Sequence, residues 1–177
     1  SKNISFADGT GIVDDTGNEQ LTFAKTASAV NEVTITNAAA SGHPAISATG
    51  GDTDVDLTLT PKGSAGRVSF NGGGKIQQIA EKVTTEATAA TGTLNYDLIT
   101  QAVWNLTTAA AANWTLDLRG DGSNSLDSIM DVGESVTCAH LVLQTGTAYY
   151  NNVFQIDGST VTPEWQGGSA PSGGNIN

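Results

Sequence analysis

The chain has 177 residues, of which only 14% are charged, against about 25% in an average soluble domain. Small and polar residues, 21 of them Gly, replace the Leu, Glu, Lys and Arg of a helical bundle and argue against that class. The net charge of −11 argues against a nucleic-acid partner, which needs clustered Lys and Arg, and no apolar run approaches the roughly 18–20 residues that cross a membrane.

Residues 1–75 are predicted to form a shaft or anchor of short β-strands separated by turns. They contain only 15 Val, Leu, Ile and Phe residues. A single layer of such strands cannot bury both of its faces, and its edges stay open. We therefore expect three copies to wrap around a shared axis and to build one intersubunit core. The expected strands are 4–6, 11–13, 21–24, 33–36, 45–48, 55–60 and 67–70.

Residues 76–82 are expected to be a connector, and residues 83–166 a β-rich head with longer strands. The stretch 136–143 is apolar on both faces, which predicts a central strand covered on both sides. The number of strands indicates an antiparallel β-sandwich or jelly roll, and the whole chain is predicted to be all-β. The expected strands of the head are 83–89, 92–98, 102–107, 113–118, 134–145, 148–156 and 160–165.

Two further segments are predicted from local signals. Residues 125–131 are expected to form one helical turn, which Ser125 caps and Gly133 ends. Residues 167–177 are a Gly-, Ser- and Pro-rich tail. We expect this tail to be truncated before a closing strand.

Seven short passages, which extend over most of the chain, are 17–23, 29–37, 46–52, 57–63, 149–152, 155–158 and 165–171. Together they resemble structural proteins of tailed bacteriophages, especially those of marine cyanobacteria. The resemblance implies a virion protein of the tail-fibre or head-appendage kind, a homotrimer with a β-rich shaft and a globular β tip. It implies no catalytic residues.

An acidic run offers the strongest metal candidate of the sequence. Asp52, Asp54 and Asp56 match the start of a calcium loop, but Leu57 and Gly63 stand where an EF-hand needs Gly and Glu. On a strand the three carboxylates would share one face, which we interpret as a solvated surface, with an ion bound between copies as the alternative. A second loop that could hold a divalent cation contains Asp117, Asp121 and Asp127.

No pattern in the sequence favours an enzyme or a cofactor. Cys138 and His140 would share a strand face, but they lie in an apolar run without a residue to orient the imidazole. We therefore expect both to pack in the core, with the Cys138 thiol buried and unreactive. Trp104 and Trp114 are also expected to be core residues.

A recognition surface is predicted where aromatic and amide side chains adjoin. Tyr149 and Tyr150 are neighbours, so one of them must point outward from a strand. With Asn151, Asn152 and Trp165 they could form a platform on which a receptor glycan stacks, while the alternative is a contact between subunits.

The leading hypothesis is a non-enzymatic structural protein of the virion, outside the cell, as a tail fibre, head appendage or capsid decoration. Its expected partners are two further copies, other virion proteins and a host-surface glycan, without nucleic acid, membrane or cofactor. The alternatives are a secreted carbohydrate-binding module, or small glycan hydrolase, and a self-assembling extracellular filament subunit.

Overall fold

The computed structural model describes residues 4–63 and 66–170, in which every regular element is a β-strand. The prediction of an all-β chain is confirmed. The chain divides into two compact units, Ser1–Thr60 and Pro61–Asn177. The boundary expected near Lys75 lies inside the second unit, and the described residues between 61 and 82 hold no strand.

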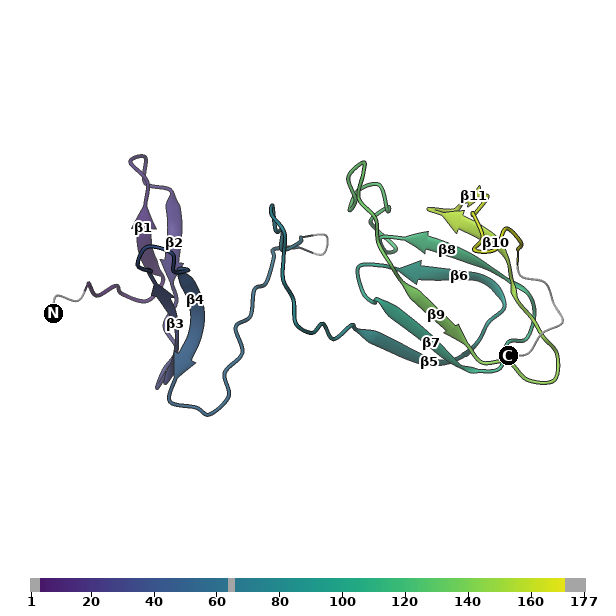
Figure 1. Ribbon diagram of the computed structural model, residues 1–177, viewed down its shortest axis with the longest axis horizontal. Coiled ribbons are helices and arrows are strands. Elements are labelled where there is room, and N and C mark those ends of the chain that lie inside the picture. Colours follow the sequence, from purple (N-terminus) through teal and green to yellow (C-terminus); the bar gives the residue numbers. More distant parts are fainter. Residues whose placement is uncertain (1–3, 64–65, 171–177) are drawn as a thin grey trace. The chain divides into compact units, whose positions relative to one another are not determined.

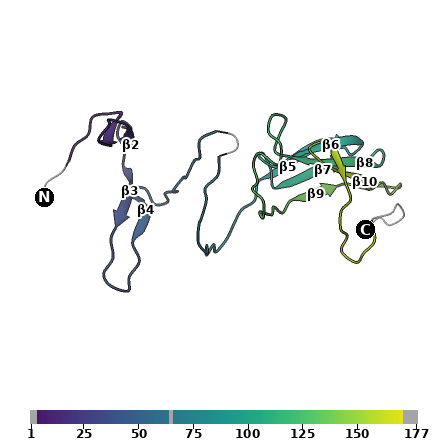
Figure 2. The same cartoon turned by 90° about the horizontal axis from the view of Figure 1, so that it is seen from above.

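The first unit contains two antiparallel hairpins. β1 (Thr10–Val13) pairs with β2 (Glu19–Phe23). β3 (Asn31–Thr36) pairs with β4 (Ala45–Gly50), and these two strands lie side by side in both ribbon views (Figures 1 and 2). All four strands match predicted ones to within a few residues.

Three predicted strands do not form, at residues 4–6, 55–60 and 67–70. Their alternating side chains suit a strand, but a strand is stable only when a neighbouring strand takes up its backbone hydrogen bonds. Nothing in the part of the chain that the structure describes pairs with these segments. The sequence pattern shows the alternation of apolar and polar side chains, but it does not show which strand would pair with the segment.

The second unit has two sheets, and the chain alternates between them. β5 (Val83–Ala89), β7 (Val103–Thr108) and β9 (Ala139–Val142) form one sheet in that order, with every pair parallel. The other sheet has the order β11-β10-β8-β6. In Figure 1 the strands of the first sheet run opposite to β6 and β8. The bounds in the second sheet are β6 (Gly92–Asp97), β8 (Trp114–Arg119), β10 (Asn151–Ile156) and β11 (Ser159–Val161).

The prediction of an antiparallel sandwich or jelly roll is therefore wrong in strand direction. Each strand from β5 to β8 pairs with the strand two places further along the chain, so that β5–β6, β7–β8 and β9–β10 are three stacked coils. The antiparallel pair of this unit is β10 with β11. Its two-residue turn consists of Asp157 (φ 48°) and Gly158 (φ 76°), the positive angles that a tight hairpin requires.

The linker between β5 and β6 explains the difference. Ala90 and Thr91 lack the Asn-Gly or Asp-Gly signal of a tight hairpin. Ala90 is instead completely buried, and its carbonyl accepts a hydrogen bond of 3.0 Å from the N–H of Ala111 in the corresponding linker of the next coil. The linkers thus stack as the strands do, and each carries the chain from one sheet into the other.

The core of the second unit lies between its two sheets. Parallel register places Leu94 beside Leu116, and Leu116 beside Phe154, so similar apolar side chains form rows across the coils. The Tyr96 hydroxyl lies 2.6 Å from the carbonyl oxygen of Ala102 and 3.2 Å from that of Ala139, which ties coil 1 to the start of β9. The buried apolar residues are Ala90, Leu94, Tyr96, Trp104, Leu106, Ala110, Trp114 and Leu116.

Two further predictions for this unit are wrong. The stretch 136–143 is not a central strand, because β9 covers only its later part and lies at the edge of its sheet. Residues 125–131 form turns and no helix. The Ser125 hydroxyl does accept a hydrogen bond from the N–H of Ser128, and Gly133 has a positive φ of 95°. Both residues thus have the conformations expected at the ends of a helix, but the segment between them forms only turns.

The coil arrangement makes Leu106 a sensitive test of the fold, because it is 1% exposed in the middle of the core. We expect Leu106→Ala to lower the free energy of unfolding of the second unit by about 2–5 kcal/mol, through lost burial and the cavity left behind. Chemical denaturation followed by tryptophan fluorescence measures this value. Thr108→Ala, at an exposed position at the end of β7, is the control and should change it by less than about 1 kcal/mol.

Candidate functional site

The two hairpins of the first unit each have an apolar face and a polar face. In β3–β4, Val33 lies opposite Ala48 and Ile35 lies opposite Ile46. The other face carries Thr34 and Thr49, whose hydroxyls are 2.6 Å apart. In β1–β2, Ile12 pairs with Leu21 on one face, and the Phe23 ring at the strand end stacks on Phe6.

These apolar faces are uncovered. Val33, Ile35 and Ile46 are 59%, 78% and 64% exposed, whereas Thr34 and Thr49 on the polar face are partly buried. No described residue of the first unit is buried. Complete burial of a Val, Leu or Ile side chain contributes about 1.5–3 kcal/mol, so a face of this kind favours association by several kcal/mol per copy.

The predicted recognition surface is divided by the fold. The Tyr149 side chain packs against the core, and the Trp165 ring packs edge-on against Phe154 with 5.4 Å between ring centroids. The Asn151 side-chain amide donates hydrogen bonds to the carbonyls of Trp114 and Val153. These three side chains are therefore engaged within their own unit.

Two residues of that prediction remain for contact with another molecule. Asn152 is exposed and Tyr150 is partly exposed. The backbone of Tyr150 is held from both sides, since its N–H donates to the Asn113 side chain and its carbonyl accepts from the N–H of Trp114. Of the five predicted platform residues, Tyr150 and Asn152 are thus the two whose side chains do not take part in the contacts above.

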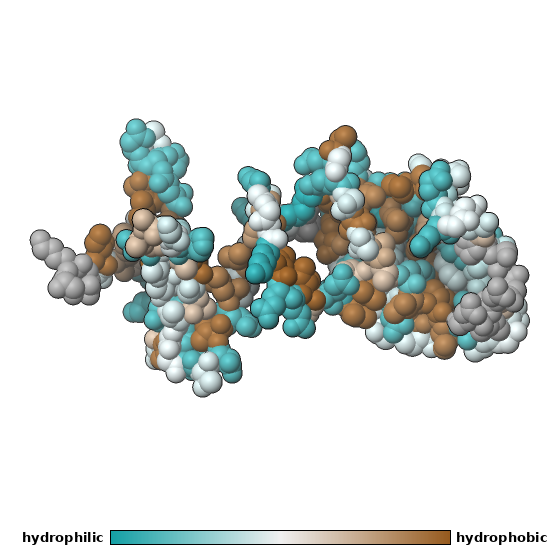
Figure 3. All heavy atoms as spheres, viewed as in Figure 1, coloured by the Kyte–Doolittle hydropathy of each residue, from teal (hydrophilic) through white to brown (hydrophobic). Residues whose placement is uncertain are grey.

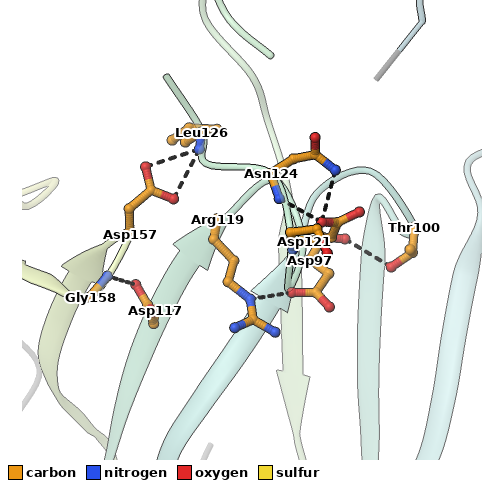
Figure 4. Close-up of polar contacts among 10 residues, drawn as sticks. Asp97, Thr100, Asp117, Arg119, Asp121, Asn124, Leu126, Asp157 and Gly158 are labelled. Carbon is orange, nitrogen blue, oxygen red and sulfur yellow. Dashed lines mark hydrogen bonds and ion pairs between the residues drawn. The ribbon is translucent and has the colours of Figure 1, made fainter. Parts of the chain in front are cut away.

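The acidic side chains at one end of coils 1 and 2 stabilise the protein's own loops (Figure 4). Arg119 pairs with Asp97 across adjacent strands at 2.6 Å. Asp121 accepts hydrogen bonds from the N–H groups of Ser123 and Asn124, and these hydrogen bonds lower its pKa.

The β10–β11 turn is held by two more carboxylates in the same view. Asp117, which is buried, accepts a hydrogen bond of 2.9 Å from the N–H of Gly158. Both carboxylate oxygens of Asp157 lie 2.9 Å from the N–H of Leu126. The sequence did not single out Asp97 or Asp157, because their partners lie 22 and 31 residues away.

Neither candidate cation site is assembled within the part of the chain that the structure describes. Among the described residues, no group of three or more His, Cys, Asp and Glu side chains could hold a metal ion. Asp52 accepts a hydrogen bond from Asn31, and Asp54 and Asp56 are exposed outside any strand. The loop with Asp117, Asp121 and Asp127 directs its first two carboxylates to the backbone N–H groups described above.

An aromatic cluster surrounds His140 in the core. The ring stacks on Trp104 at 5.1 Å and meets Tyr96 and Trp114 edge-on at 6.2 Å each. Burial lowers the pKa of His140 to about 4. No described residue hydrogen-bonds its Nε2 atom. Burial also raises the pKa of the partly buried Cys138 thiol. His140 stacks within this aromatic cluster and Cys138 packs against the core, but Cys138 is only partly buried, so the full burial expected of its thiol is not reached.

A cavity of about 490 Å³ lies beside an ion pair of the second unit. Arg67 contacts Glu134 at 2.7 Å, which fixes residue 67 against the loop before β9. Apolar side chains of Leu98, Ile99, Ile129, Met130 and Val136 line most of the cavity. Among the described residues, the charged groups that line the cavity are Arg67 and Glu134, which pair with each other.

Comparisons with known proteins returned no match among protein families, curated proteins or solved structures. None of the described residues belongs to a helix that is long and apolar enough to traverse a membrane. The function is therefore inferred from the residues and their geometry.

The stability of the second unit should fall between pH 6.5 and pH 4. The pKa of His140 is about 4 in the folded chain and near 6.5 in an unfolded one, so the unfolded chain binds more protons in this range. The stabilisation is complete above pH 6.5 and is lost as the pH falls towards 4. Allowing for partial burial, we expect a loss of about 1–3 kcal/mol by denaturation at each pH.

Two variants separate this effect from general acid unfolding. His140→Gln should flatten the profile between pH 6.5 and 4, whereas His43→Gln, at an exposed histidine of the first unit, should leave it unchanged. An unaltered profile in His140→Gln would show that another group causes the loss.

Cys138 should react slowly with a thiol reagent in the native protein. Its partial burial and raised pKa both reduce the concentration of accessible thiolate. We expect labelling by 5,5′-dithiobis(2-nitrobenzoate) at pH 8 to be at least tenfold slower than in denaturant, from the absorbance of the released thiolate. Equal rates in the two conditions would place Cys138 outside the folded unit.

Proposed function

We propose that this chain is a non-enzymatic structural protein that works as a homotrimer, in which the first unit supplies an intersubunit core. The observation that carries the proposal is the pair of amphipathic hairpins without a single buried described residue. The resemblance to tailed-bacteriophage proteins supports a place in the virion, as a tail fibre, head appendage or capsid decoration. Other virion proteins would anchor it there.

Exposed apolar faces need a partner for energetic reasons. A two-stranded hairpin is marginally stable alone in water, and the first unit has two. Three ribbons around one axis let each apolar face contact two others, whereas two ribbons leave the sides of their shared layer open to water. Val33, Ile35 and Ile46 would form such a core, and the Thr-rich face of β3–β4 would remain in solvent.

Host attachment is the role that the second unit supports best. Its sheets and aromatic core provide a rigid support, and Tyr150 and Asn152 are available at the start of β10. A tyrosine ring next to an amide suits stacking on a neutral sugar and hydrogen bonding to it. Three copies would add weak contacts into stable adhesion.

A filament subunit is the second candidate, because the parallel coils end in open strand edges. β9 is the last strand of its sheet, and β5 and β6 are edge strands of coil 1. Unpaired backbone groups at such edges can pair with a second copy. Electron microscopy of the purified chain distinguishes long filaments from discrete trimers.

The assembly prediction uses two neighbouring positions on opposite faces of β3. We expect sedimentation velocity at micromolar concentration to show three copies of the unmodified chain. Ile35→Lys should raise the dissociation constant at least about 100-fold, because each copy would bury an unpaired charge in the shared core. Thr36→Lys carries the same added charge on the polar face and should leave the assembly intact.

A folded, monomeric chain at 100 μM would contradict the homotrimer. Equal effects of Ile35→Lys and Thr36→Lys would contradict the assignment of the apolar face to the intersubunit core. Circular dichroism of each variant checks that the second unit remains folded.

The attachment prediction concerns Tyr150. We expect Tyr150→Ala to weaken adsorption to host cells or binding on a glycan array at least tenfold, because a stacking surface is removed. Tyr149→Phe is the control, since it preserves the ring that packs against the core. Unchanged binding by an assembled Tyr150→Ala variant would show that Tyr150 is not part of the recognition surface.

A further inference from the structure

The outer face of the β5-β7-β9 sheet is a second uncovered surface, separate from the hairpins. Trp104 and Leu106 of β7 are buried between the sheets, so the alternating residues Val103 and Asn105 lie on the opposite, outer face. Parallel register extends this face in two rows. The rows are Val83–Val103–Ala139 and Thr85–Asn105–Leu141.

This face combines apolar exposure with a complete lack of charge. Val83 is 55% exposed and Leu141 is 52% exposed. None of the six residues in the two rows is ionisable. In the space-filling view, hydrophobic side chains reach the surface of both units (Figure 3).

The other sheet has a different outer face. There the rows contain Asn95 beside Asp117 and Asp97 beside Arg119. The Arg119–Asp97 ion pair lies on this face, and the Asp117 carboxylate there is buried under the β10–β11 turn, whose Gly158 N–H it binds, so this face carries charged groups. In a chain with a net charge of −11, an uncharged face is where two identical copies can approach with the least electrostatic repulsion.

The size of the face indicates which partner can cover it. Three strands about 4.8 Å apart, each contributing about five residues at 3.3 Å, span roughly 230 Å². A stable interface between free partners takes about 800 Å² from each. This face is therefore too small to hold a free partner, but large enough for copies that another contact already keeps at a high effective concentration.

We propose that the outer face of the β5-β7-β9 sheet packs against neighbouring copies of this chain within the assembly. The inference rests on the proposed homotrimer, in which the hairpins of the first unit provide the tether. The second unit then contributes to the assembly through Val83, Val103 and Leu141. Its other sheet, with Tyr150 and Asn152 at the start of β10, stays open to the host.

Site-directed labelling tests this face with a matched pair of positions. Thr85 and Thr93 are both exposed threonines on edge strands of coil 1, one on the outer face of each sheet. Thr85→Cys and Thr93→Cys are made in full-length chains that also carry Cys138→Ser, so that each has one thiol. Labelling uses a 5 kDa polyethylene glycol maleimide, at a concentration where sedimentation shows the assembly.

We expect Thr85→Cys to react at least tenfold more slowly than Thr93→Cys in the assembled protein. Adding Ile35→Lys, which separates the copies, should make the two rates equal. Leu141→Cys, in the other row, should be protected like Thr85→Cys. The measurement therefore reports on the face and not on one substitution.

Equal labelling of Thr85→Cys and Thr93→Cys in an assembled protein would overturn this inference and leave the homotrimer standing. Protection that persists in monomers would also overturn it, because the cover would then come from the same chain. If sedimentation finds a monomer at every concentration, the proposed function fails first, and this inference fails with it.

Discussion

Apolar side chains on a two-stranded ribbon cannot be buried by the ribbon itself, and the first unit consists of two such ribbons. Its Thr residues pair across the polar face of β3–β4, while Val33, Ile35 and Ile46 on the other face stay in water. The second unit meets the same constraint differently. Its chain crosses from one sheet to the other after every strand up to β10, so that each coil covers the next and Tyr96, Trp104 and Leu106 become buried. The second unit therefore completes its core within the chain, and in the proposed homotrimer the first unit would complete its core with neighbouring copies.

The polar groups of the second unit follow from the coil arrangement. Parallel register puts Asp97 beside Arg119, and Asp117 binds the N–H of Gly158 in the β10–β11 turn. These carboxylates satisfy backbone donors and one arginine, and this role accounts for acidic residues that the sequence offered as cation ligands. The His140 ring is also engaged within the unit: it packs against the rings of Trp104, Trp114 and Tyr96, and its burial lowers its pKa, which favours the neutral form. These carboxylates and His140 are thus engaged by groups of their own unit.

Local sequence signals predicted the all-β class and most strands, because side-chain alternation and turn residues act over a few positions. The strands predicted at 33–36 and 45–48, which lie within β3 and β4, are of this kind. Strand partners were not predictable in the same way. An alternating strand can join a hairpin or a parallel coil, and the buried linker at Ala90 decides between them. The Phe154–Trp165 contact, which engages one ring of the predicted recognition platform, could not be predicted for the same reason, since it arises from tertiary packing.

Amide hydrogen exchange as a function of protein concentration tests the central claim, that copies share the core of the first unit. Residues 31–50 of β3–β4 should exchange slowly in the assembly and lose that protection on dilution, because their faces are covered only by other copies. Residues 92–119 of β6 to β8 should remain protected at every concentration, because their core lies within one chain. Protection of residues 31–50 that does not change with dilution would contradict the account, as would its absence at 100 μM.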